Sequence, residues 1–272
     1  ACAILPSGYA ANVALISILV KKGDIVLNDS VNHASIIDGC RTTDGIIRFY
    51  KHCDMENLEK KLRQYDYEKP KLIITDGVFS MDGDIAPLDQ IYELAKKYNA
   101  CLMVDDAHGL GVLGKNGSGT ADHFGLTDKV DLIMGTFSKS LASIGGFIAA
   151  DLDTINYLKH NARSLIFSAS IAPANAASVI AAVDLIQSEP ERIQNLWDNT
   201  SYAMAALKKA GFDTGHSVTP IIPILIRDDY KTFQLTKLAL ERGIFVNPVV
   251  SPAVPSTSSL IRYSLMATHT KD

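Results

Sequence analysis

Leu72-Ile-Ile-Thr75 begins the part of the sequence that determines the fold class. A helical pattern at residues 88–99 and then Cys101-Leu-Met-Val104 follow it. Two short apolar runs enclose a segment with helical spacing, so the order is strand, helix, strand. Strands that are apolar on both faces are typical of a parallel or mixed sheet covered by helices on each side. We therefore expect an α/β protein with a mostly parallel central sheet and helices on both faces.

The same alternation extends outward from this stretch. Helical patterns occupy residues 8–22, 33–40 and 54–65, and strand patterns occupy residues 24–27, 46–50, 132–136 and 146–150. Helices dominate after residue 152, at 173–188 and 190–210, and a smaller part follows with strands at 221–226, 244–250 and 260–266 around a helix at 230–242. A boundary near Pro173 predicts a large domain at residues 1–173 and a smaller C-terminal αβ domain at 174–272.

Composition and charge exclude several classes of protein. The 272 residues are 47% hydrophobic, and 26 Lys and Arg face 30 Asp and Glu, for a formal net charge of −4. This balance offers no basic face for nucleic acid and no polybasic signal for a membrane surface. No apolar run is long enough to span a bilayer, and the apolar fraction excludes disordered and collagen-like chains. A soluble, globular α/β enzyme remains.

The cysteines and the two ends of the chain indicate its setting. Cys2, Cys40, Cys53 and Cys101 form no CxxC pair and have no His cluster beside them, so we expect reduced thiols in a cytoplasmic protein and no zinc site. Neither an initiator Met nor a signal peptide opens the sequence. We expect the chain to be part of a longer protein.

Side chains that carry chemistry follow three of the expected strands. They lie in Asp76-Gly-Val-Phe-Ser80, in Asp105-Asp-Ala-His108 and in Thr136-Phe-Ser-Lys139. Because the carboxyl ends of parallel strands meet at one edge of a sheet, these groups should converge there. Lys139 has small and hydroxyl-bearing neighbours, so desolvation would expose an amine nucleophile. An ordinary surface lysine is the alternative.

The residues around Asp105 allow more than one functional interpretation. Asp105 could pair with a protonated heterocyclic nitrogen, and His108 could donate to a neighbouring phenolic oxygen; alternatively, the acid caps its loop. A metal pair of Asp105 and His108 lacks a third ligand at suitable spacing. The GxGxxG match at Gly109-Leu-Gly-Val-Leu-Gly114 is followed by loop residues rather than by a helix, so it does not predict dinucleotide binding.

Five motifs together resemble the α-oxoamine synthases. They are Ser7-Gly-Tyr-Ala-Ala-Asn12, Asn32-His-Ala-Ser35, Asp76-Gly-Val-Phe-Ser-Met-Asp-Gly83, Val104-Asp-Asp-Ala-His-Gly109 and Gly135-Thr-Phe-Ser-Lys139. This family has the fold-type I aminotransferase architecture and uses pyridoxal 5′-phosphate (PLP). The resemblance covers essentially the whole chain, with the motifs in the family's order. It implies the same fold and the same cofactor here.

The resemblance also implies roles at the ring of the cofactor. Lys139 would hold PLP covalently and then act as base and acid at the substrate Cα. Asp105 would pair with the pyridine nitrogen, and His108 would donate to the phenolate oxygen with Ser80 nearby. His33 would stack on the ring and orient the substrate carboxylate, although a histidine that merely caps a helix is the plainer reading.

Further positions match the family's phosphate and substrate contacts. Gly8 and Tyr9 would offer N–H groups to the phosphate at a helix N-terminus, and Thr136 would add a hydroxyl. Ser168 and Ala169 match a stretch that reaches the partner subunit's phosphate, although Ala169 lacks the polar side chain often found there. Arg262 matches the arginine that binds the α-carboxylate of the amino acid; a surface charge at a strand edge is the alternative.

The implied activity is a decarboxylating condensation of a small amino acid with an acyl-CoA to give an α-amino ketone. Ala253, Asp106-Ala107, the 135–146 segment and Ala267-Thr-His-Thr270 favour serine palmitoyltransferase-like members, with L-serine and a long-chain acyl-CoA and hence a place in sphingolipid biosynthesis. Alternatives are 8-amino-7-oxononanoate synthase, 2-amino-3-ketobutyrate CoA ligase, an aminotransferase or retro-aldol enzyme, a non-catalytic subunit and, most distantly, a metal hydrolase. The resemblance implies a cytoplasmic homodimer with active sites shared across the interface, and no metal.

Overall fold

The computed structural model describes residues 1–271, which form two compact units. The first unit contains residues 1–78 and 86–188, and the second contains residues 79–85 and the chain from Glu189 onward. Helix α8 (Pro173–Ser188) belongs to the first unit. The domain boundary that the sequence places at residue 173 stays a prediction, and each unit is described separately below.

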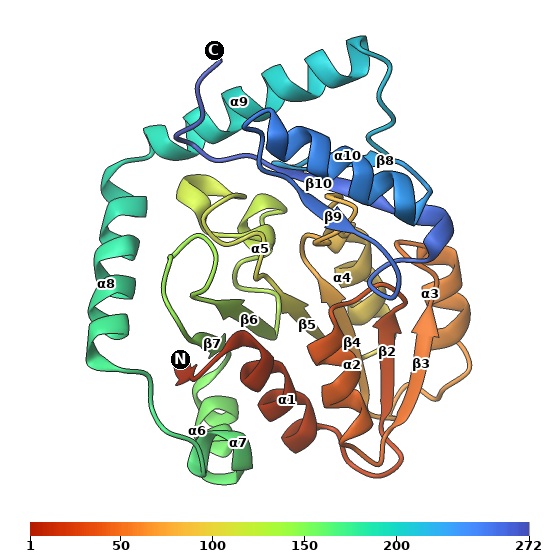
Figure 1. Cartoon of the computed structure of the whole chain (residues 1–272). Coiled ribbons are helices and arrows are strands. Elements are labelled where there is room, and N and C mark those ends of the chain that lie inside the picture. The colour runs from red at the N-terminus through yellow and green to blue at the C-terminus, as the bar shows by residue number, and fades with distance from the viewer. Residues whose placement is uncertain (272) are drawn as a thin grey trace. The chain divides into compact units, whose positions relative to one another are not determined.

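A seven-stranded sheet forms the centre of the first unit, in the order β1-β7-β6-β5-β4-β2-β3 (Figure 1). Its strands are β1 (Cys2–Leu5), β2 (Ile25–Asp29), β3 (Ile46–Tyr50), β4 (Lys71–Asp76), β5 (Cys101–Asp105), β6 (Leu132–Thr136) and β7 (Gly146–Ala149). The central strands pair in parallel, whereas β7 runs antiparallel to both β6 and β1. This mixed sheet confirms the fold class predicted from the sequence.

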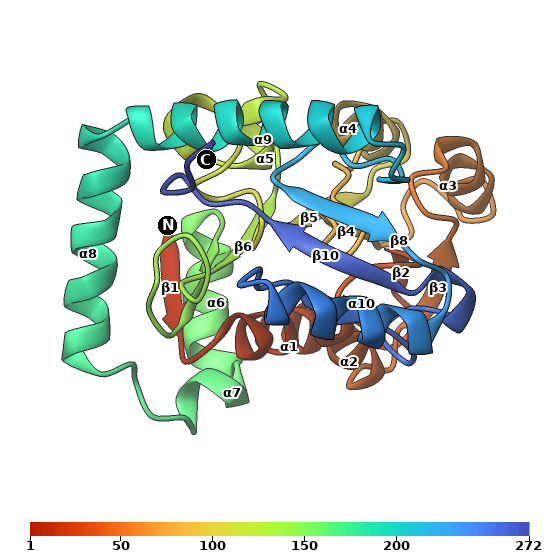
Figure 2. The same ribbon diagram turned by 45° about the horizontal axis from the view of Figure 1, so that its top comes forward.

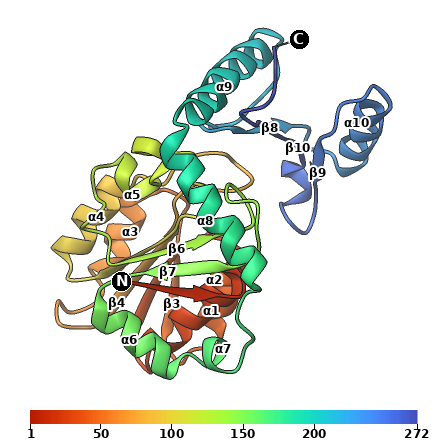
Figure 3. The same ribbon diagram turned by 90° about the vertical axis from the view of Figure 1, so that its left-hand side faces the viewer.

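Helices cover both faces of this sheet. They are α1 (Gly8–Leu19), α2 (Ala34–Arg41), α3 (Met55–Leu62), α4 (Leu88–Lys97), α5 (Thr120–His123), α6 (Leu152–Asn161) and α7 (Arg163–Ile166), with a 3₁₀ turn at Lys115–Gly117. Figure 3 shows α3, α4 and α5 on one side of the sheet and α1 and α2 on the other. The principal apolar core joins α1, α2 and α6 to the inner strands. The connections after β4, β5 and β6 therefore emerge between two helical layers.

Helices α1 and α2 pack closely against each other because Gly39 leaves room between them. A Cβ atom on Gly39 would lie 3.0 Å from Ile16 Cδ1 and 3.3 Å from the carbonyl oxygen of Asn12. Ile16 and Asn12 are both fully buried. The contact places the inner face of α1 against α2, which has His33 as its N-cap and contains Ser35.

The second unit is built on a three-stranded antiparallel sheet in the order β8-β10-β9. Its elements are α9 (Glu191–Lys209), β8 (Ile221–Leu225), α10 (Asp229–Glu241), β9 (Asn247–Val249), a 3₁₀ turn at Ser256–Ser258 and β10 (Leu260–Ser264). Figure 2 shows β8 and β10 side by side and running in opposite directions. Residues 79–85 join this unit through Gly83, whose carbonyl oxygen accepts hydrogen bonds from Val218 N and Thr219 Oγ1.

The structure differs from two expectations about strands. Strand β1, which the sequence pattern did not predict, has only four residues and alternates exposed with buried side chains. The strand expected at 244–250 begins only at Asn247, because Gly243 adopts a left-handed conformation after α10 and Ile244 and Phe245 are exposed. No helix within residues 1–271 has the length and apolar run needed to cross a bilayer.

Candidate active site

Two acidic side chains lie next to each other where β4 and β5 end. Asp76 and Asp105 are register partners in this parallel pair, and both are buried. Asp105 Oδ2 accepts a hydrogen bond of 2.8 Å from Asn12 Nδ2, and Asp105 Oδ1 accepts one of 3.0 Å from Ala107 N. Asp76 Oδ1 has a longer contact of 3.4 Å with His33 N. The two donors at Asp105 favour its ionised form.

Burial raises the pKa of both carboxyls, and their neighbours differ. The pKa of Asp76 lies well above its ordinary value because of burial and then because of the charge of Asp105. The pKa of Asp105 is also raised by burial, and the Asn12 amide, the Ala107 N–H and the charges of Lys139 and His33 oppose that rise. The two hydrogen bonds from Asn12 and Ala107 make Asp105 the carboxyl of this pair that better supports a negative charge.

Lys139 lies in the loop between β6 and β7, and its side chain is exposed. Its charge lowers the pKa values of both Asp76 and Asp105, so the ammonium lies near this carboxyl pair. The loop is closed by hydrogen bonds from Phe137 N to Gly145 O (2.9 Å) and from Ser143 N to Phe137 O (2.8 Å). His108 lies in the turn three residues after Asp105.

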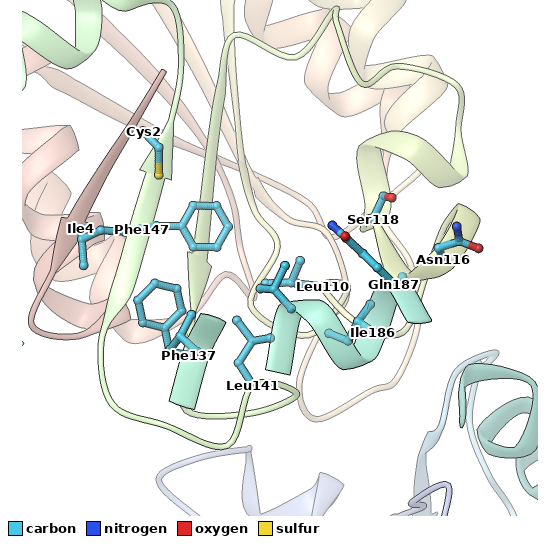
Figure 4. Close-up of a pocket in the computed structure, with 13 residues that line it drawn as sticks. Cys2, Ile4, Leu110, Asn116, Ser118, Phe137, Leu141, Phe147, Ile186 and Gln187 are labelled. Carbon is cyan, nitrogen blue, oxygen red and sulfur yellow. The ribbon is translucent and has the colours of Figure 1, made fainter. Parts of the chain in front are cut away.

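Apolar packing fixes the same loop from one side. Phe137 is buried and stacks on Phe147 with ring centroids 5.9 Å apart. Phe137 and Leu141 line a cavity of about 690 Å³ together with side chains from β1, β7, α8 and the segment around Leu110 (Figure 4). Phe137 and Leu141, two positions before and after Lys139, are therefore anchored, while Lys139 itself is exposed.

His33 caps helix α2, and its ring orientation is determined by Ser35. His33 Nδ1 accepts a hydrogen bond of 3.2 Å from Ser35 N and lies 2.7 Å from Ser35 Oγ. The capping role that the sequence allowed for His33 is thus real. Since His33 N also lies 3.4 Å from Asp76 Oδ1, the residue lies close enough to the carboxyl pair to belong to the same site.

A glycine at the start of α1 meets the end of β6. A Cβ atom on Gly8 would lie 3.1 Å from Thr136 Cβ and 3.2 Å from Thr136 Oγ1. Ser7 Oγ, the N-cap, accepts a hydrogen bond from Ala10 N. Tyr9 directs its hydroxyl away to Asp38 Oδ2, at 2.6 Å, so only its backbone N–H remains available at the helix start. Gly8, Tyr9 and Thr136 are brought together as expected.

The remaining predicted residues lie elsewhere. Ser168 and Ala169 are exposed, between α7 and α8 in the first unit. Ser80 and Arg262 both belong to the second unit, where Arg262 Nε donates to the carbonyl oxygen of Ser80 at 2.7 Å. Burial lowers the pKa of the Arg262 guanidinium.

One group of metal-ligating side chains occurs in the part of the chain that the structure describes. Asp29, His52 and Cys53 bring their ligand atoms within 4.8 Å of one another. The carboxylate of Asp29 already accepts from Val31 N, His52 Nδ1 and Cys53 N, each at 3.0 Å. These bonds account for the cluster as a structural cap at the end of β2.

Three residues of the site were missed by sequence reasoning. Asn12 and Ser35 stand in motifs that the sequence singled out, but without a role; Asn12 Nδ2 donates both to Asp105 Oδ2 and to Ser35 Oγ, each at 2.8 Å. Asn32 fixes the turn before His33, because its Oδ1 accepts from Asp76 N at 2.8 Å. A polar residue one helical turn after Gly8 was the available signal for Asn12.

Comparison with known proteins identifies the family. The model of the family "Aminotransferase class I and II" matches residues 2–272. The chain is 56% identical to the serine palmitoyltransferase of Sphingobacterium spiritivorum, over 99% of this chain and 67% of that protein. It is 47% identical to the 8-amino-7-oxononanoate synthase of Thermosipho melanesiensis, over 98% of this chain and 68% of that protein.

Solved structures give the same result. The serine palmitoyltransferase from S. paucimobilis with bound PLP–myriocin aldimine superposes with a TM-score of 0.96 at 34% identity, covering 100% of this chain and 69% of that one. The fold and the strand-end site thus define a fold-type I PLP-dependent enzyme. The chain belongs to the aminotransferase class I and II family. The fold and the cofactor that the sequence predicted are confirmed.

Proposed function

We propose that this chain is a serine palmitoyltransferase-like enzyme that condenses L-serine with a long-chain acyl-CoA, releasing CO₂ and CoA. The observation that carries the reaction class is the buried Asp105 at the end of β5, which accepts hydrogen bonds from Asn12 and Ala107 and belongs to the same unit as Lys139 and His33. Identities of 54–56% to three serine palmitoyltransferases support the choice of substrates. An 8-amino-7-oxononanoate synthase is the second candidate, supported by identities up to 47%.

The start of helix α1 suits the phosphate of PLP. Gly8 leaves open the space beside Thr136 that a Cβ atom would crowd. The N–H groups of Gly8 and Tyr9 lie at the positive end of the helix dipole, and Thr136 adds a hydroxyl. In our proposal these groups bind the phosphate dianion, and glycine at position 8 permits its close approach.

The carboxyl pair suits the pyridine ring. Asp105 would hold a proton on the ring nitrogen because its own carboxylate stays ionised under the Asn12 and Ala107 donors. With its nitrogen protonated, PLP supplies an electron sink for the substrate Cα. His108 would donate to the phenolic oxygen, and Lys139 would hold the cofactor and then carry the Cα proton.

Substrate orientation would come from His33 and Arg262. His33 would stack on the ring with its Nε2 toward the substrate, since Nδ1 is occupied by Ser35. Arg262 would bind the α-carboxylate through the end of its guanidinium, because its Nε is held by the carbonyl oxygen of Ser80.

We propose a homodimer in the cytoplasm as the working form. The exposure of Ser168 and Ala169 supports a role at a partner subunit's phosphate, with Ser168 supplying the hydroxyl and Ala169 only its backbone. Both the dimer and the shared site follow the family resemblance.

The proposal is tested on the PLP-loaded protein. Absorbance is titrated with serine, glycine and alanine, and CoA thiol release is then followed with acyl-CoAs of increasing chain length. We expect serine and long chains to be preferred; release with a short dicarboxylic acyl-CoA and alanine would indicate the synthase instead. Lys139→Ala should abolish both the cofactor absorbance shift and turnover, and turnover at the wild-type rate would overturn the assignment.

A further inference from the structure

The carboxylate of Asp105 and the ring of His33 are joined by two buried polar side chains. Asn12 Nδ2 donates to Asp105 Oδ2 and to Ser35 Oγ, both at 2.8 Å, and Ser35 Oγ lies 2.7 Å from His33 Nδ1. Asn12 is fully buried and Ser35 is 1% exposed. All four residues belong to the first unit. The chain of contacts is thus continuous, and its two linking side chains are buried.

The charge of Asp105 fixes the direction of every hydrogen bond in this chain. An ionised carboxylate only accepts, so the amide of Asn12 must present its nitrogen rather than its oxygen. Ser35 Oγ accepts from the same nitrogen, and its own proton is then free to go to His33 Nδ1. Because Ser35 N also donates to His33 Nδ1, at 3.2 Å, this ring nitrogen is an acceptor twice.

We infer that Asn12 and Ser35 are positioning residues that transmit the ionised state of Asp105 to His33 and hold His33 as the Nε2–H tautomer. A proton on Nδ1 would face two donors and would break both bonds. The ring therefore offers an N–H donor on its outward side.

The cost of this arrangement is visible at Asn12. Its Oδ1 is buried and has no hydrogen-bond partner in the structure. A buried carbonyl oxygen without a donor destabilises a fold, so such a group is expected where another requirement sets the side chain's orientation. Here both amide hydrogens are used, on Asp105 and on Ser35. The close approach of α1 and α2 at Gly39 makes this geometry possible.

The inference deepens the proposed function, since it concerns the residue proposed to orient the substrate. Its test needs neither cofactor nor turnover. Nitrogen-15 spectra of the histidine rings at alkaline pH report which ring nitrogen carries the proton, and His33→Gln identifies the His33 signals. We expect wild type to show Nδ1 unprotonated and Nε2 protonated. A wild-type spectrum with the proton on Nδ1 would overturn the inference.

Two variants test the chain of bonds. Ser35→Ala removes the hydroxyl but keeps the backbone donor, so the ratio of Nε2–H to Nδ1–H should fall about fivefold, as expected for one neutral hydrogen bond. Asn12→Asp, which does not touch His33, should turn the Ser35 hydroxyl toward the new carboxylate and lower the ratio similarly. In the double variant the second change should add nothing, because both act through the same proton.

Controls separate this effect from general damage. Ser17→Ala removes a hydroxyl on α1, the helix that contains Asn12. This hydroxyl donates to the carbonyl oxygen of Ala14, so the variant should leave the ratio of Nε2–H to Nδ1–H unchanged. Ser35→Thr restores a hydroxyl and should return the ratio toward wild type. Circular dichroism verifies that each variant is folded. An unchanged ratio in folded Ser35→Ala and Asn12→Asp would refute the relay whatever the activity of the loaded enzyme.

Discussion

Asp76 and Asp105 are register partners at the ends of β4 and β5, yet they are surrounded by different hydrogen-bond donors. Asp105 accepts from a side-chain amide at 2.8 Å and a backbone N–H at 3.0 Å, whereas Asp76 has one long backbone contact at 3.4 Å. Two adjacent buried carboxyls cannot both be charged without a large cost, so the negative charge is favoured on the carboxyl with more hydrogen-bond donors. The hydrogen bonds therefore favour the negative charge on Asp105 and the proton on Asp76.

This asymmetry predicts that two isosteric substitutions change the free energy of unfolding by different amounts. Asp76→Asn replaces a protonated carboxyl by an amide of the same shape, and we expect the free energy of unfolding to change by less than about 1 kcal/mol. Asp105→Asn turns an NH₂ group toward Asn12 or Ala107, which leaves two donors facing each other and costs about 1–3 kcal/mol. Urea unfolding of the apo protein measures both. Equal losses for the two variants would contradict the assignment of charge.

The environment of Asp106 predicts that the free energy of unfolding falls as pH rises. Burial raises the pKa of its carboxyl to about 6 in the folded state, from an ordinary value of 3.8. The folded state therefore binds the proton more tightly, and this contribution is present below pH 3.8 and is lost as pH rises through about 6. The loss is roughly 3 kcal/mol.

Asp106→Asn tests that dependence. Its amide can accept from Thr120 N and donate to Thr120 Oγ1, the two atoms that contact the carboxylate at 2.9 and 2.5 Å. We expect the variant to flatten the decline in unfolding free energy between pH 4 and pH 6, measured by urea titration at each pH. An unaltered pH profile would show that Asp106 titrates normally.

Gly8→Ala is expected to weaken cofactor binding more than folding. The new Cβ would lie 3.1 Å from Thr136 Cβ and would narrow the space proposed for the phosphate. We expect the dissociation constant for PLP to rise about tenfold, with little change in thermal stability. Gly45→Ala is the matched control, because its Cβ would meet Val20 Cγ1 remote from Gly8. That variant should lower the melting temperature and leave PLP affinity unchanged; the reverse pattern would rule out the phosphate role.

Arg262→Lys should affect the amino acid more than the acyl-CoA. Lysine cannot bond the carbonyl oxygen of Ser80 and present a planar fork at the same time. We therefore expect KM for serine to rise about tenfold, the equivalent of one charge-assisted hydrogen bond, with KM for acyl-CoA unchanged. Steady-state kinetics on the PLP-loaded enzyme give both constants. An equal rise in both would place Arg262 outside the carboxylate site.

Much of this site could be predicted from the sequence because the carboxyl ends of parallel strands lie at one edge of a sheet. Apolar runs fixed β4, β5 and β6, and the polar residues after each run followed directly. The Asn12–Ser35 bond was not readable, since it joins residues 23 positions apart through the packing of α1 on α2. That packing depends on the tertiary fit of Gly39 against Ile16. Periodicity along one helix carries no information about it.

The short strands β1 and β9 were also difficult to predict from the sequence. β1 has four residues and β9 has three, too few for an alternation to stand out from chance. β1 is defined by its antiparallel partner β7, and β9 by its partner β10. Their existence is a property of the sheet rather than of the segment.

The membership of residues 79–85 in the second unit has a consequence for engineering. The chain leaves the first unit after Val78, returns at Ala86 and leaves it again after Ser188. A fragment that starts at Glu189 would lack Gly83, whose carbonyl oxygen accepts from Val218 N and from the hydroxyl of the buried Thr219, and both donors would lose this partner. The second unit therefore cannot be exchanged between homologues as one contiguous cassette; a functional chimera must transplant the 79–85 loop with it.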